Sequence, residues 1–230
     1  MDNLVQFFLA LFLFNCLFLA ASSRMLHLIK LTAVQGILLG ILPLMSDLGT
    51  LQLENCVLGF INISVKGFIL PYLLYVAMKK ASVQRELEPV IGYSVSAFAV
   101  LLFCGISFWV ADRLGLSTRL ATAEVATSFA LLLTGLFLIA ARKKALTQVI
   151  GFLTFENGIA LFGIGLMKHH PLLVELGILL DVFVLVFIMG IAVCQIKREF
   201  AHIDADKLSS LDDFPEKVSS VNTVAKEATK

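Results

Sequence analysis

The chain has 230 residues, of which 59% are apolar and 15% are charged, and its mean hydropathy is +0.93. An ordinary soluble domain is about 45–50% apolar and about 25% charged. The composition therefore excludes a soluble globular domain, a disordered chain and a nucleic-acid-binding protein. Residues 1–198 carry 14 Lys and Arg against 10 Asp and Glu, a net charge of +4, whereas residues 199–230 carry four against seven, a net charge of −3. An apolar body with a short charged tail is typical of a polytopic membrane protein with one soluble terminus.

Seven apolar stretches are long enough to cross a bilayer as helices, which takes about 20 residues. They are residues 4–22, 26–45, 56–78, 90–111, 120–141, 146–167 and 172–196. Asp2 precedes the first stretch, where a signal peptide would carry basic residues, so we predict a membrane span there rather than a cleaved leader. Unpaired backbone groups are not tolerated in lipid, and the apolar runs do not alternate as barrel strands do. The sequence therefore predicts an all-α, polytopic membrane helix bundle with seven transmembrane helices.

Basic residues are concentrated in the loops on one side of these spans. Nine lie on one side, at Arg24, Lys79, Lys80, Arg85, Arg142, Lys143, Lys144, Lys197 and Arg198, and three lie on the other, at Arg113, Arg119 and Lys168. The positive-inside rule then puts the N-terminus outside and the C-terminus in the cytoplasm. Residues 1–145 are predicted to form a five-helix membrane part, 146–198 a two-helix segment and 199–230 a cytoplasmic tail.

No motif for covalent chemistry is found along the chain. The four cysteines each stand alone in an apolar stretch, where we expect them to behave as small buried hydrophobic residues. The sequence contains no glycine-rich phosphate loop, nucleophile elbow or metal-ligand spacing. We therefore predict no catalytic residue, no metal site and no cofactor, and a chain that is not an enzyme on its own.

Ionisable residues inside the predicted spans are the main functional candidates, because a charge at the bilayer centre costs roughly 2.5–3.5 kcal/mol on insertion scales. They are Lys30, Lys66, Glu156, Glu175 and Asp181. Three of them, Lys66, Glu156 and Asp181, each lie about 15 Å from the start of their predicted span at the helical rise. These three are therefore expected to share the bilayer midplane. Lys30 and Glu175 lie about one turn from a membrane end and can reach water.

Charged groups at the midplane must pair, be hydrated or become neutral. Groups balanced in this way can load and release protons, so we predict a proton relay through Glu156 and Asp181 with Lys66 as charge partner. The alternative is one ion pair between Lys66 and a carboxylate that only holds the bundle together. A second tier comprises Lys30, Glu175 and three amides, namely Gln35 at a similar depth, Asn157 next to Glu156, and Gln148 two turns before Glu156. Pro71 removes a backbone hydrogen bond and is expected either to kink its span or to be tolerated there.

Residues 148–159 read QVIGFLTFENGI, residues 176–187 read LGILLDVFVLVF, and Lys66 precedes Pro71 by five positions. In these features the chain resembles the hydrogenase-4 component E family over its whole membrane part. Members are membrane-arm subunits of energy-converting complexes that join a [NiFe] hydrogenase or a related redox module to ion-pumping subunits. Residues 146–198 are similar to the K-type subunit of complex I and to the C-type subunit of Mrp cation/proton antiporters.

The resemblance implies that Glu156 and Asp181 take the roles of two midplane glutamates that carry protons laterally in the complex I subunit. The chain departs from that pattern in two ways: aligned on Asn157, the first carboxylate is displaced by about one turn, and the second is Asp rather than Glu. The partners implied are antiporter-like proton-pumping subunits, an H-type membrane subunit and a soluble [NiFe] hydrogenase or related module. The location implied is the bacterial cytoplasmic (inner) membrane.

Three hypotheses follow from the sequence. The first is a non-catalytic, proton-conducting subunit of an oxidoreductase complex. The second is a scaffold subunit for assembly of the membrane arm, or an accessory subunit of an Mrp-type antiporter. The third, a stand-alone transporter or receptor, is disfavoured because no internal repeat is visible and Lys66 lies on the third span.

Overall fold

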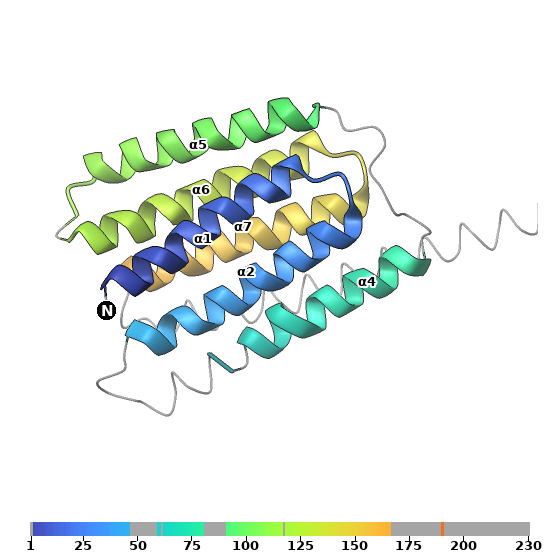
Figure 1. Ribbon diagram of the computed structural model, residues 1–230, viewed down its shortest axis with the longest axis horizontal. Coiled ribbons are helices and arrows are strands. Elements are labelled where there is room, and N and C mark those ends of the chain that lie inside the picture. The colour runs from blue at the N-terminus through green and yellow to red at the C-terminus, as the bar shows by residue number, and fades with distance from the viewer. Residues whose placement is uncertain are drawn as a thin grey trace, which may run out of the picture. The chain divides into compact units, whose positions relative to one another are not determined.

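The computed structural model describes residues 2–46, 59–60, 62–80, 91–116, 118–166 and 190. Each regular element in these ranges is a helix, which confirms the all-α class (Figure 1). The helices are α1 (Asp2–Ala21), α2 (Met25–Ser46), the π-helix η1 (Ile63–Ile69), α4 (Leu70–Lys80), α5 (Tyr93–Arg113), α6 (Arg119–Ala141) and α7 (Ala145–Leu166).

Five of the described helices, α1, α2, α5, α6 and α7, are long and apolar enough to cross a membrane. Their ends lie close to the predicted span ends because hydrophobic length sets both. In its described part, the predicted third span, 56–78, consists of η1 and α4. The predicted seventh span, 172–196, lies outside the described residues except for Gly190. The count of seven spans and the sidedness of the termini therefore stay predictions.

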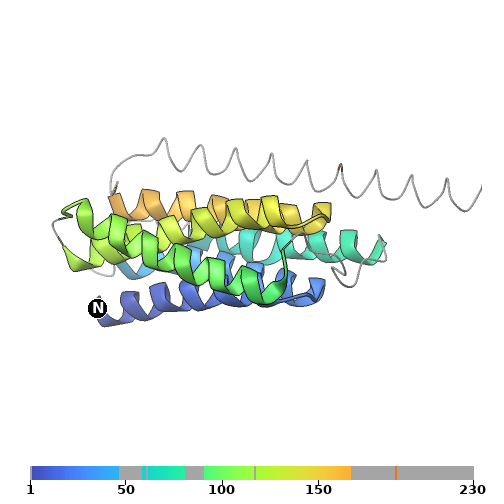
Figure 2. The same ribbon diagram turned by 90° about the horizontal axis from the view of Figure 1, so that it is seen from above.

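Successive helices run in alternating directions, and α1 packs beside α2, α2 beside η1 and α4, α5 beside α6, and α6 beside α7 (Figure 1, Figure 2). The turn after α1, the end of α4 and the turn between α6 and α7 lie at one end of this bundle (Figure 1). These segments contain most of the basic residues used to orient the chain, including Arg24, Lys79 and Lys143. The described helices thus bring those basic residues to a common end, as alternating membrane passes require.

The turn between α5 and α6 shows how local sequence sets a helix boundary. Gly115 has a φ of +61°, in the left-handed region that glycine adopts without a Cβ penalty. Its N–H donates to the Asp112 carbonyl at 3.4 Å. Three residues later Thr118 caps α6, because its hydroxyl accepts from the Ala121 N–H at 3.1 Å.

Helices α6 and α7 form the most extensive contact between two described helices, and glycines make it possible. A Cβ added at Gly135 would lie 2.5 Å from the Phe155 backbone nitrogen. A Cβ added at Gly151 or Gly158 would lie 2.9 Å from a backbone nitrogen of α6. Small residues that let two backbones approach in this way are typical of helix association in membranes.

Three buried apolar clusters fill the described bundle, and the two larger ones follow one another along α2 and α7. The first lies toward the α1–α2 turn and includes Leu28 of α2, Leu138 of α6 and Ile150 of α7. The second lies further along and includes Leu39 of α2 and Leu161 of α7. On α2 and α7 the buried side chains between these two clusters are polar, and they are where the candidate site is found.

Candidate functional site

Four buried side chains, which we term the polar layer, lie between the two apolar clusters. They are Gln35 of α2, Lys66 of η1, and Glu156 and Asn157 of α7, and each is at most 5% exposed. Gln35 lies ten residues from the start of α2 and eleven from its end, and Glu156 lies eleven from the start of α7 and ten from its end. At the helical rise, both positions are about 15 Å from either helix end.

Lys66 and Glu156 form a buried ion pair. The Nζ atom of Lys66 donates to Oε1 of Glu156 at 2.7 Å, a distance typical of a charge-assisted hydrogen bond. The lysine side chain is 5% exposed and the glutamate side chain 2%. Removing two charges from water is costly, and their mutual attraction compensates only when the geometry is good. Each group therefore compensates the charge of the other at a buried position where a single charge would be unfavourable.

Lys66 lies in a π-helix, and the local sequence explains this wider turn. The Leu70 N–H donates to the Val65 carbonyl, the i to i−5 bond that defines a π-helix. Pro71 follows directly and has no N–H to continue the usual ladder. The distortion expected near Pro71 thus takes the form of a π-helix, an element frequently found at functional sites.

Glycines of α2 and η1 bring Lys66 close to the second helix. A Cβ at Gly36 would lie 2.5 Å from the carbonyl carbon and oxygen of Lys66, and a Cβ at Gly67 would lie 2.8 Å from the Ile37 side chain. Gly40, one turn further, is equally close to Ile63. The Lys66 backbone therefore packs directly on α2, which fixes the level from which its side chain reaches α7.

Asn157 connects the polar layer to α2 and α1. Its Nδ2 donates to Oε1 of Gln35 at 3.4 Å, and Nε2 of Gln35 donates to the Cys16 sulfur at 4.0 Å. Successive helical residues point about 100° apart, so Glu156 faces η1 while Asn157 faces α2. The polar layer thus runs laterally from η1 through α7 to α2, where Gln35 contacts Cys16 of α1.

The other predicted site residues lie elsewhere. Gln148 does not extend the polar layer: its Nε2 donates to the Arg142 carbonyl at 3.0 Å, at the start of α7. Lys30 is exposed and lines a surface hollow near the α1–α2 turn. Glu175 and Asp181 lie outside the described residues. Within the described ranges, no three His, Cys, Asp or Glu side chains are placed to hold a metal ion.

Arg142 is a buried residue that the sequence analysis treated only as a loop charge. It is 2% exposed, and its Nη2 donates to the Ala20 carbonyl at 2.7 Å. Its guanidinium also lies over the Tyr93 ring, 4.6 Å from the centroid. Arg142 therefore ties the ends of α1 and α6 to the start of α5. No local pattern in the sequence distinguishes it from its neighbour Lys143, which is exposed.

The apolar helices and the buried polar layer define an all-helical, multi-pass membrane protein. The chain matches no family model and no solved structure. It is 31% identical over 191 residues to the uncharacterized protein Rv0085 of Mycobacterium tuberculosis (strain ATCC 25618 / H37Rv), across 81% of this chain and 86% of that protein. The chain therefore belongs to the same family as Rv0085.

Proposed function

We propose that this chain is a non-catalytic membrane subunit of an energy-converting complex of the group 4 [NiFe] hydrogenase type, in a bacterial cytoplasmic membrane. In this role it takes part in proton translocation through Glu156, with Lys66 as charge partner and Asp181 as the second carboxylate. Its partners are antiporter-like pumping subunits, an H-type membrane subunit and a soluble redox module. The resemblance to the hydrogenase-4 component E family supports this assignment.

The observation that carries the proposal is the Lys66–Glu156 ion pair. Its Nζ and Oε1 atoms lie 2.7 Å apart, and the pair is buried between two apolar clusters. Moving the shared proton from Nζ to Oε1 converts the ion pair into an amine and a carboxylic acid without changing the net charge. Burial brings these two forms closer in energy than they are in water, because it penalises the charged form. The shared proton can therefore move within the pair without exposing an isolated charge to lipid, and a further proton taken up from a neighbour protonates Glu156 and gives the pair a net charge of +1.

The direction of transfer follows from the surroundings of the pair. Apolar residues fill the bundle on both sides of the polar layer, while Asn157 and Gln35 continue the layer toward α1. A proton that reaches Glu156 therefore has polar neighbours laterally rather than along the helix axes. Gaps wider than about 3.5 Å between such groups are bridged by water in proteins.

The test is Glu156→Gln in the intact complex, since glutamine keeps the shape and removes the titratable group. We expect redox-driven proton uptake into inverted membrane vesicles to be lost while the redox module stays active. The matched control is Glu124→Gln on α6, a half-buried carboxylate outside the polar layer. A full proton gradient with Glu156→Gln would contradict the relay.

A scaffold role is the second candidate, because the same ion pair joins segments that lie 90 residues apart in sequence. In that case Glu156→Gln and Lys66→Met would impair assembly, which blue-native gels resolve, but proton uptake per assembled complex would stay at the wild-type level. An accessory role in an Mrp-type antiporter would instead show as co-purification with antiporter subunits and no redox module.

A further inference from the structure

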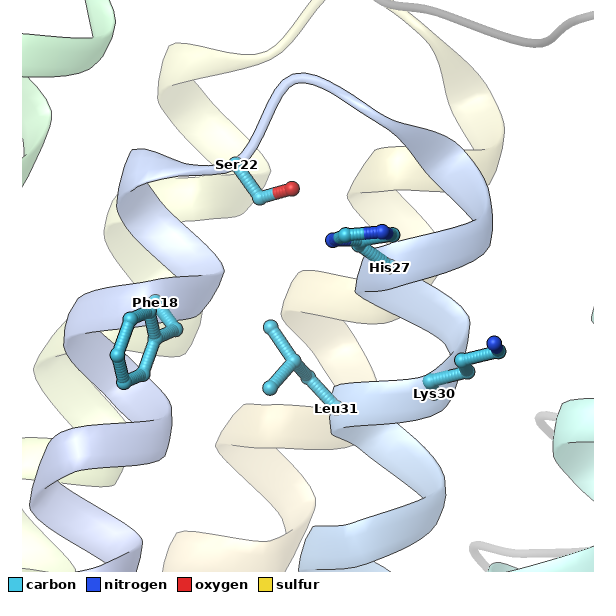
Figure 3. Close-up of a pocket in the computed structure, with 5 residues that line it drawn as sticks. All are labelled: Phe18, Ser22, His27, Lys30 and Leu31. Carbon is cyan, nitrogen blue, oxygen red and sulfur yellow. The ribbon is translucent and has the colours of Figure 1, made fainter.

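A surface hollow lies at the end of the bundle next to the α1–α2 turn, and no residue of the polar layer lines it. Its volume is about 340 Å³, and it is lined by Phe18, Ser22, His27, Lys30 and Leu31 (Figure 3). We propose that this hollow binds the head group and upper acyl chain of an anionic phospholipid. The proposal is independent of the proton relay, since none of these residues belongs to the polar layer.

The hollow is polar toward the turn and apolar toward the middle of the helices. Ser22 and His27 lie next to the turn, and Phe18 and Leu31 lie below them (Figure 3). Phe18 is 63% exposed, and Phe14, one turn earlier on α1, is 62% exposed. Aromatic side chains with this exposure on a membrane helix face acyl chains. The vertical order of the groups therefore matches a phospholipid, with its phosphate at the turn and its chains along α1.

Charge favours an anionic ligand at this position. Residues 3–46 contain Arg24, His27 and Lys30 near this turn and no Asp or Glu. Within the described part of the chain, neither His27 nor Lys30 forms an ion pair. Lys30 lies about one turn inside the predicted membrane end of its span. From this depth a lysine can extend its ammonium to the level of the lipid head groups. Basic pockets between membrane helices are known to recognise phosphorylated lipid head groups.

The experiment measures lipid binding to the full chain, purified in mild detergent, by native mass spectrometry. The probes are dioleoyl phosphatidylglycerol and dioleoyl phosphatidylcholine, which share acyl chains and differ in head-group charge. We expect phosphatidylglycerol to bind preferentially, and Lys30→Met or His27→Gln to weaken its binding about five-fold each. Lys79→Met, at an exposed lysine outside the hollow, is the matched control and should leave binding within about two-fold.

Three results would overturn the proposal. One is equal binding of the two lipids, and another is wild-type phosphatidylglycerol binding in both Lys30→Met and His27→Gln. The third is displacement of the lipid by millimolar inorganic phosphate, which would indicate a site for a soluble anion. Both substituted side chains are exposed, so neither packs the core, and circular dichroism of each variant checks that the helices are retained.

Discussion

Nζ of Lys66 and Oε1 of Glu156 lie 2.7 Å apart although their residues are 90 positions apart in sequence. The sequence left open which carboxylate Lys66 meets, and the described helices bring it to Glu156. The contact links η1 to α7 at a level where both side chains are buried. The contribution of this ion pair to the free energy of unfolding can be measured separately from any role in transport.

Removing one partner of the pair should destabilise the protein strongly. Lys66→Met leaves the Glu156 carboxylate buried without its ammonium, a change that costs about 3–5 kcal/mol in proteins. The double variant Lys66→Met/Glu156→Leu buries no charge and should be close to wild type or more stable. Denaturant titration of the detergent-purified chain gives the free energy of unfolding for each variant.

The double variant also separates stability from transport. If it assembles normally but supports no proton uptake, the pair has a role beyond holding helices together. Lys79→Met controls for loss of a lysine at an exposed site. A wild-type free energy of unfolding for Lys66→Met alone would contradict the buried ion pair.

The fold was predictable to the extent that hydrophobic length determines it. The predicted span 120–141 corresponds to α6 at Arg119–Ala141, and 146–167 corresponds to α7 at Ala145–Leu166. The π-helix was not predicted, because a wider turn leaves the hydrophobic pattern almost unchanged. Pro71 was its single local signal, and proline is also tolerated in regular membrane helices.

Within the site, depth along each helix was predictable but rotation about its axis was not. Counting residues gave similar levels for Lys66, Glu156 and Gln35, and all three are buried in the polar layer. The same counting placed Gln148 two turns from Glu156 on roughly one face, yet its amide bonds the Arg142 carbonyl. That contact depends on how the chain turns between α6 and α7, which periodicity does not encode.

A methyl group at Gly36 should disturb the site without removing either charge of the ion pair. A Cβ there would lie 2.5 Å from the Lys66 backbone, so α2 and η1 would have to separate. Gly36→Ala is expected to lower the free energy of unfolding by roughly 1–3 kcal/mol, the usual cost of overpacking. Gly105→Ala on α5 is the matched control, because a Cβ there meets nothing within 4 Å. Equal stability of the two variants would show that the α2–η1 contact is looser than described.

The Asn157–Gln35 hydrogen bond should contribute less than the ion pair. Its donor and acceptor are neutral and 3.4 Å apart, so Asn157→Ala should cost about 0.5–2 kcal/mol. A double-mutant cycle with Gln35→Met isolates the coupling between the two amides. A cost equal to that of Lys66→Met would mean that the amides, rather than the charges, dominate the polar layer.

Arg142 should be the strongest structural contact at the basic end of the described bundle. Arg142→Met removes the 2.7 Å bond to the Ala20 carbonyl and the contact with the Tyr93 ring, and should cost about 2–4 kcal/mol. Arg142→Lys keeps the charge but loses the planar group that stacks on the ring, so it should recover only part of that stability. Lys143→Met at the exposed neighbour should change stability little. Tyr93→Leu removes the aromatic face beneath the guanidinium and should therefore lower stability as well. Unfolding titrations of these variants would contradict the assignment if Arg142→Lys were indistinguishable from wild type.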